Sequence, residues 1–338
     1  MSHEFETGLY IERPAWHGLG LVLDADHGMS TSELVAKAFP GPVEGMAAKW
    51  QLAPTHAEAH GTTYPTGQAC VVRDVEPHII PNSTGSLDRM IRQPGENAEL
   101  LQNALGGLGW LPGSSMISLR EGARIVLLAK LTDEIKVGGT DAVNLYAVCF
   151  DSYDGTLPLT FGTTAVRVVC QNTLNMALPD VEARPHVKIK HTKNANVKVG
   201  DVQAAMSVSF KWAEEFERTA NLLSNTEVTK RRFEDIVREA FPMSSADRAK
   251  GRNFSDQQYA MIGVRESSPT IGDDIRDTGW GALNAVSEFL EWGRGSRNTT
   301  GAEADSEAAT TAMAERRFES TLTGGQADVS KVASLILA

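Results

Sequence analysis

The sequence predicts an α+β fold: a central antiparallel sheet of strand-strand-strand-helix order, with peripheral helices and a helical C-terminal region. Three observations carry this prediction. Apolar, β-branched runs at 124–131 and 142–150 are typical of strands. Asp154-Gly155 gives a hairpin turn signal before a third strand at 157–169. Apolar residues at helical spacing dominate after residue 200.

The N-terminal part is expected to contain few regular elements. A capped helix is predicted at 31–39, and the rest of residues 1–60 predicts loops. Residues 69–73 predict a short strand. Apolar spacing from 86 to 108 predicts a helix that is interrupted near Pro94.

Helices are expected after the third strand. The segment 171–178 predicts the helix of the core, and 201–240 predicts a long helix with a polar break. Further helices are expected at 280–290 and 329–337, separated from the long helix by a loop-rich stretch at 243–275.

These elements suggest three regions along the chain. Residues 1–112 form a loop-rich N-terminal region, 113–200 the sheet-and-helix core with a basic segment, and 201–338 a helical region. Residues 294–309 are rich in Gly, Ser, Thr, Ala and Asp, which predicts a mobile loop.

Composition limits the function classes. The chain has 32 Lys and Arg against 43 Asp and Glu, a formal charge of −11, which excludes a histone-like coat of positive charge but permits a local basic groove. There is no apolar run of about 18 residues and no signal peptide, so we expect a cytoplasmic protein without a membrane partner. Cys70, Cys149 and Cys170 predict buried thiols, with neither disulfides nor a thiolate zinc site.

Common catalytic and cofactor motifs are missing. The phosphate-loop, GxGxxG and GxSxG patterns are absent, so we expect no cofactor, assign no catalytic residue and favour a non-enzymatic protein, while leaving enzyme activity open. The pairs His56/His60 and His186/His191 lack the further ligands of a metal site, so no metal is expected.

The most distinctive charge feature is a basic segment. Residues 183–200 contain no acid, and Lys188 and Lys190 alternate with apolar residues, so a strand would place both on one face. The segment contains five cations, Arg184, Lys188, Lys190, Lys193 and Lys198. It predicts a track for a phosphate backbone; the alternative is a solvated basic loop.

Other residues extend this candidate track. Arg124 and Lys130 lie on the first core strand, and Arg167 lies at the end of the third. Gln171 and Asn172 begin the predicted helix, where they would donate to phosphate or simply cap the helix.

Four segments together resemble one family: Trp16–Gly20, the strand-rich stretch 123–150, Val166–Leu174 (which contains RVVCQNTL) and Trp280–Phe289 (WGALNAVSEF). They look like the phage/plasmid-like proteins grouped as a domain of unknown function. The resemblance implies a bacteriophage, prophage or plasmid setting and gives no activity.

A second resemblance concerns topology. Three antiparallel strands followed by a helix look like the core of single-strand annealing proteins of the RecT/Redβ type, which form rings or filaments around a basic groove for single-stranded DNA. No sequence motif is shared, so this resemblance is a fold-level analogy.

Three functions follow as hypotheses. The first is a phage-encoded protein of homologous recombination that binds and anneals single-stranded DNA without ATP, as a homo-oligomeric ring or filament. The second is a protein-protein interaction or scaffold protein that does not bind DNA. The third is a metal-dependent nuclease that uses Asp151 and Asp154, or the set Asp273, Asp274 and Asp277.

Overall fold

The chain divides into two compact units in the computed structural model. Unit 1 comprises residues 1–131, 146–163 and 185–209, and unit 2 comprises 132–145, 164–184 and 210–338. The structure describes residues 5–12, 20–76, 78–107, 109–131, 135–167, 187–193, 199–290 and 327–338. The predicted loop at 294–309 and the predicted helix at 171–178 lie outside these ranges.

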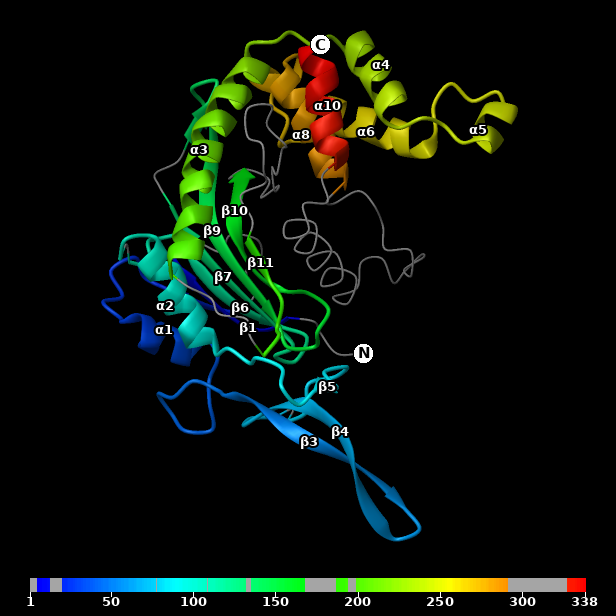
Figure 1. Cartoon of the computed structure of the whole chain (residues 1–338). Helices are drawn as coiled ribbons and strands as arrows, with labels where there is room; N and C mark the ends of the chain where they lie inside the picture. Colours follow the sequence, from blue (N-terminus) through cyan, green and yellow to red (C-terminus); the bar gives the residue numbers. More distant parts are fainter. Residues whose placement is uncertain are drawn as a thin grey trace. The chain divides into compact units, whose positions relative to one another are not determined.

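Strands and helices are both well represented, as the α+β prediction requires (Figure 1). The strands are β1 (Phe5–Ile11), β2 (Leu21–Leu23), β3 (Trp50–Ala59), β4 (Thr62–Arg73), β5 (Gly85–Ser86), β6 (Ser115–Leu119), β7 (Arg124–Lys130), β8 (Ile135–Val137), β9 (Asp141–Ser152), β10 (Leu159–Arg167) and β11 (Val187–Ile189). The helices are α1 (Thr31–Ala38), α2 (Pro94–Ala104), α3 (Val199–Ser224), α4 (Lys230–Ala240), α5 (Ser245–Ala249), α6 (Asp256–Ser267), α7 (Asp273–Arg276), α8 (Gly279–Glu288) and α10 (Ala327–Leu337).

The main sheet is mixed and wider than the three strands that the sequence predicts. Its order is β11-β10-β9-β7-β6-β1-β2, with β8 paired to β9. The β1–β2 pair is parallel, whereas β1–β6, β6–β7, β7–β9, β8–β9 and β10–β11 are antiparallel. The three predicted core strands are confirmed as β7, β9 and β10, and β11 forms one edge of the sheet.

Apolar residues on the strands explain the position of the core in unit 1. Strands β6 and β7 are buried along almost their whole length, as is the part of β9 that belongs to this unit. Helix α1 packs against β1 and β6, and α2 packs against β7 (Figure 1). The helices therefore cover part of the sheet, as α+β packing requires.

Several local predictions for the N-terminal part are wrong. Strands β1 and β3 replace predicted loops. Strand β1 pairs with β6, more than one hundred residues away, so its partner leaves no local signal. Strand β3 instead pairs with β4, which follows it directly in the chain. The helix at 31–39 is confirmed as α1, which begins with a capping box between Ser30 and Glu33. Residues 86–93 do not form the first part of a helix; Pro94 instead takes the first position of α2, where it costs no hydrogen bond.

A β-hairpin arm, defined here as residues 54–68 of β3, β4 and their turn, extends from unit 1 (Figure 1). Its base is anchored by Trp50, which is buried, stacks on Tyr153 at a centroid distance of 5.1 Å and donates from Nε1 to the Gly122 carbonyl at 2.9 Å. His56 and His60, expected in a solvated loop, lie on this arm and are exposed.

Unit 2 is mainly helical. The predicted long helix is two helices, α3 and α4, because the chain turns at 225–229 before Thr229 caps α4. The loop-rich prediction for 243–275 is wrong, since this stretch forms α5, α6 and α7. Helices α8 and α10 are confirmed, and α10 packs on α4 and α8. No helix within the described ranges is long and apolar enough to cross a membrane.

Candidate nucleic-acid interface

The described part of the basic segment lies at one end of the strand order of the main sheet. Strand β11 pairs with β10 in only three register positions, with Lys188 opposite Thr160. Lys188 and Lys190 are exposed, whereas Val187 and Ile189 are half-buried. The alternation expected from the sequence is therefore confirmed, and it presents two lysines to solvent from one edge.

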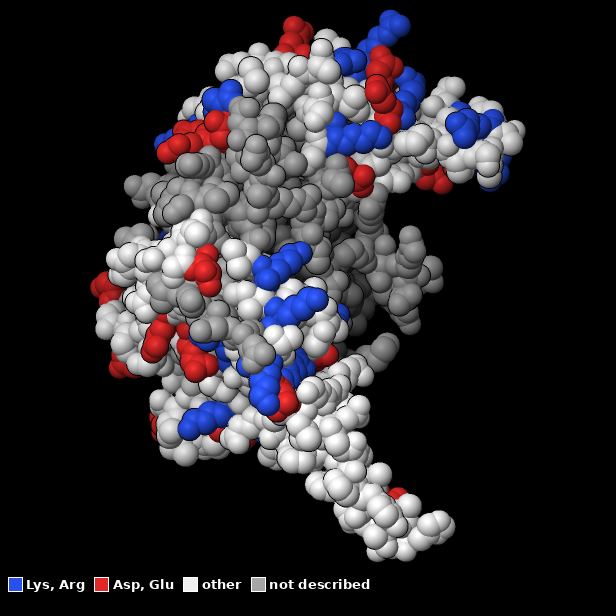
Figure 2. Space-filling view, in the orientation of Figure 1, with Lys and Arg blue, Asp and Glu red and all other residues white. Residues whose placement is uncertain are grey.

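Exposed positive charge continues past the strand. Residues 187–193 contain three lysines and no acid. Lys193 is exposed and forms an ion pair with Asp88 at 3.1 Å, in which both side chains are more than half exposed, so solvent screens the pair. Figure 2 shows Lys and Arg side chains gathered over this edge. We call Lys188, Lys190 and Lys193 the lysine edge.

A buried carboxylate contacts the chain within the lysine edge, between Lys190 and Lys193. Asp151 is the last residue but one of β9 and is 0% exposed, and its Oδ2 accepts a hydrogen bond from Asn97 Nδ2 of α2 at 2.8 Å. Its Oδ1 accepts from the Ser152 amide at 2.8 Å and lies 3.1 Å from His191 Nε2. The imidazole contact lacks hydrogen-bond geometry, so it is a close approach of the two side chains and not a hydrogen bond. Asp151 thus joins α2, β9 and the segment after β11.

The helix side of this cluster carries additional arginines. Arg92 Nε donates to Asn97 Oδ1 at 2.9 Å, and Arg89 Nη2 donates to the Ser152 carbonyl at 2.9 Å. Burial lowers the pKa of Arg89, while Asp151 and neighbouring acidic groups oppose this shift. These arginines offset the buried carboxylate and leave little net negative charge beneath the lysine edge.

Arg124 does not belong to an exposed track. It is 4% exposed; its Nε lies 3.6 Å from Asp154 Oδ2 and its Nη2 donates to Thr156 Oγ1 at 3.1 Å. A buried, paired guanidinium offers no free surface for a phosphate, so this structure gives the predicted DNA contact of Arg124 no support, and the contact stays a prediction. Burial raises the pKa of Asp154, but hydrogen bonds from Ser152 and Thr156 and the charge of Arg124 lower it overall.

The remaining predicted site residues lie elsewhere or outside the described chain. Lys130 is half-buried at the end of β7, and β7 is separated from β11 by two strands, about 14 Å across the sheet. Arg167 is the last residue of β10, and the structure does not describe its side chain. Arg184, Lys198, Gln171 and Asn172 lie outside the described residues. The structure therefore brings together Lys188, Lys190 and Lys193, and it does not join Arg124 or Lys130 to them.

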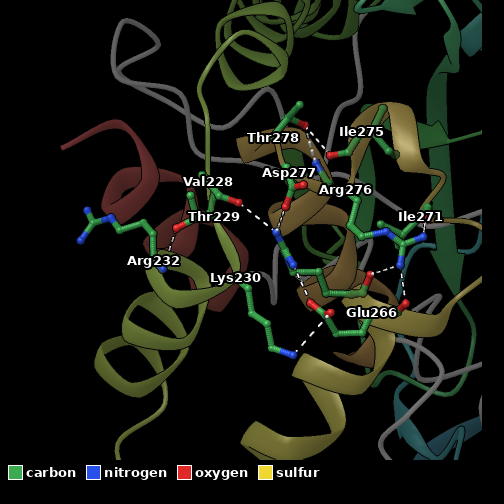
Figure 3. A network of polar contacts seen from close by, with 12 residues as sticks. Val228, Thr229, Lys230, Arg232, Glu266, Ile271, Ile275, Arg276, Asp277 and Thr278 are labelled. Carbon is green, nitrogen blue, oxygen red and sulfur yellow. Dashed lines mark hydrogen bonds and ion pairs between the residues drawn. The ribbon is translucent and has the colours of Figure 1, made fainter.

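Both acid sets proposed for a nuclease are occupied by other contacts. In unit 2, the buried Arg265 donates to Asp277 Oδ1 at 2.6 Å, to Glu266 Oε1 at 2.6 Å and to the Val228 carbonyl at 2.9 Å (Figure 3). Arg276 Nη2 lies 3.0 Å from Asp273 Oδ1. No group of three His, Cys, Asp or Glu side chains within the described ranges is arranged to hold a metal ion.

The two described cysteines offer no nucleophile at this site. Cys149 lies two residues before Asp151 and is buried, and burial together with the charge of Asp151 raises the pKa of its thiol. A neutral buried thiol is inert. Cys70 is half-buried on β4, and Cys170 lies outside the described residues.

Sequence reasoning missed the residues that support the lysine edge. Asn97, Arg89 and His191 come from three separate segments, and no short motif connects them. The one signal that could have found them is Asn97, a polar residue at a core-facing position of α2.

Comparison with known proteins identifies one family. The model of a domain of unknown function (DUF932) matches residues 90–313, which is more than half of the chain. No curated protein and no solved structure matches.

Proposed function

Since the chain belongs to the DUF932 family, whose domain has no known function, we propose from its own residues that it binds single-stranded DNA through the lysine edge. The single observation that carries this proposal is the exposure of Lys188, Lys190 and Lys193 on an acid-free segment of a chain with a net charge of −11. Cations clustered in this way attract phosphate even when the whole protein is acidic.

The mechanism is phosphate neutralisation at a firm edge. Residues two apart on an extended chain are about 7 Å from each other, so Lys188 and Lys190 reach separate phosphates. Asn97 holds Asp151 in the core, and Asp151 in turn contacts His191 in the middle of the basic segment, so less side-chain and backbone freedom is lost on binding. Arg184 and Lys198, at the two ends of the basic segment, lengthen the track in this proposal.

Our proposal extends to the biological setting. The wider activity in this proposal is the annealing of complementary strands in recombination, without ATP. The proposed setting is the cytoplasm of a bacterial host, with a gene carried by a phage, prophage or plasmid. The two resemblances described above support both parts. A short track grips a strand weakly, so we also propose that several copies bind one strand together.

A double substitution tests the lysine edge. In Lys188→Ala/Lys190→Ala, we expect the slope of log Kobs against log salt for a single-stranded oligonucleotide to fall by about 1.4, since each lost phosphate contact removes about 0.7. Lys37→Ala/Lys49→Ala removes two other exposed lysines of unit 1 and is the matched control. Equal slopes in the two variants would show that the lysine edge does not contact DNA.

A second function keeps support from a separate observation. Lysines on an edge strand also prevent other strands from pairing with that strand, so the exposed lysines have a role in a protein that does not bind DNA. The β-hairpin arm favours such a role. If DNA binding is absent from the wild type, protein-protein interaction becomes the leading function.

A further inference from the structure

The β-hairpin arm has no covering surface within the described chain. Every residue from 56 to 68 is exposed, although β3 and β4 pair along this length. Strand β5 pairs with β4 only at Gln68 and Ala69, at the base of the arm. A two-stranded ribbon exposed on both faces is marginally stable alone in water, which favours an arrangement in which another chain covers it.

The charge of the arm excludes two classes of partner. Between Gln51 and Val72 the sequence contains no Lys or Arg and one acid, Glu58. Figure 2 shows the arm as a projection almost without charged side chains. Nucleic acids and anionic membranes are both bound through lysine and arginine, so neither fits this surface. Depletion of charge is instead typical of the centre of a protein interface, where aromatic residues such as the half-exposed Tyr64 are enriched.

The edge of the main sheet at β11 and the outer edges of the arm differ in the charge of their side chains, and this difference bears on which partner the arm accepts. Lys188 and Lys190 line the edge at β11 and oppose pairing with another strand. The arm carries no lysine; it contains four Thr, two Ala and one Tyr. Pro54 and Pro65 each remove one amide donor, which confines an added ladder to the distal half of the arm.

We propose that the arm is a self-association surface that pairs with the arm of a second copy of this chain. An identical arm matches in length and lacks opposing charge, whereas two bodies of charge −11 repel each other elsewhere. A projecting, uncharged ribbon allows contact while it keeps the acidic bodies apart. Pairing about a two-fold axis is isologous, so each arm offers the other the same edge. This surface is separate from the lysine edge.

Sedimentation velocity of the full chain over a range of concentrations tests the proposal. The wild type is expected to assemble, and a variant in which residues 57–64 are replaced by an Asn-Gly turn between the facing His56 and Pro65 is expected to remain monomeric. Tyr64→Glu and Tyr64→Lys, on an exposed side chain, should each weaken assembly by about tenfold or more through like-charge repulsion.

Mixing the two charged variants tests whether the partner of the arm is a second copy of this chain. Equal amounts of Tyr64→Glu and Tyr64→Lys should restore assembly, because opposite charges then face each other across the arms. Tyr259→Glu changes a tyrosine of similar exposure, 54% against 50%, on α6 and is the control expected to assemble as the wild type does. A monomeric wild type, or a shortened arm that assembles normally, would overturn the proposal. Assembly without DNA binding would instead leave this proposal standing and remove the proposed function.

Discussion

Asp151→Asn tests whether the buried carboxylate beneath the lysine edge stabilises unit 1. The two Asp151 oxygens accept from Asn97 Nδ2 and from the Ser152 amide, each at 2.8 Å, and the residue is 0% exposed. An amide replaces one acceptor by a donor, so one of these donors loses its partner whichever way the new side chain is turned.

The magnitude follows from the lost contact and the group left without a partner. A hydrogen bond to a charged group contributes about 1.5–3 kcal/mol, and a buried unsatisfied donor costs about 1–3 kcal/mol. We therefore expect the free energy of unfolding of unit 1 to fall by about 3 kcal/mol. Asp88→Asn makes the same chemical change in the exposed pair with Lys193, where a loss below about 1 kcal/mol is expected.

Urea unfolding followed by hydrogen exchange of peptides from β7, which lies wholly in unit 1, measures both variants. This probe avoids treating a chain of two units as a single transition. Equal losses for Asp151→Asn and Asp88→Asn would refute the reasoning, because burial and the two accepted hydrogen bonds would then have no energetic consequence.

Two further predictions concern Asp154 and the helical glycines. The pKa of Asp154 is lowered in the fold, so the stability it contributes is present above its ordinary pKa of about 3.9 and is lost as the pH falls through the lower folded value. Asp154→Asn should flatten this acid limb in thermal unfolding followed from pH 7 to about 2, and an unchanged limb over that range would contradict the prediction. In Gly281→Ala, the added Cβ would overlap the carbonyl oxygen of Ile275 and lie 2.8 Å from the carbonyl carbon, so we expect the free energy of unfolding of unit 2 to fall by more than about 1 kcal/mol. In Gly263→Ala, the added Cβ meets no atom within 4 Å, so this control should stabilise α6 by up to about 1 kcal/mol.

The fold could be predicted where the local signal agreed with the tertiary environment. The apolar runs of β7 and β9 are buried as expected, and α8 and α10 follow their helical spacing. The stretch 243–275 gives a wrong, loop-rich prediction because its composition is polar. Its capping residues are nevertheless visible in the sequence, since Ser244 with Asp247 and Ser255 with Gln258 mark the starts of α5 and α6.

The site could be predicted only in part. The exposure of Lys188 and Lys190 follows from strand alternation, which needs nothing beyond local spacing. The pairing of the buried Arg124 depends on Asp154, about thirty residues away in the sequence. The partner of Asp151 on α2 lies more than fifty residues away. Such pairings are set by the topology of the sheet and leave no pattern in neighbouring residues.

The most direct test of the central claim is fluorescence anisotropy of a labelled single-stranded oligonucleotide, titrated with the wild-type chain at several salt concentrations. With Lys188, Lys190 and Lys193 each contacting one phosphate, we predict binding at low salt and a slope of log Kobs against log salt of about −2 or steeper. Absence of binding at low salt, or binding that does not change with salt, would contradict this claim.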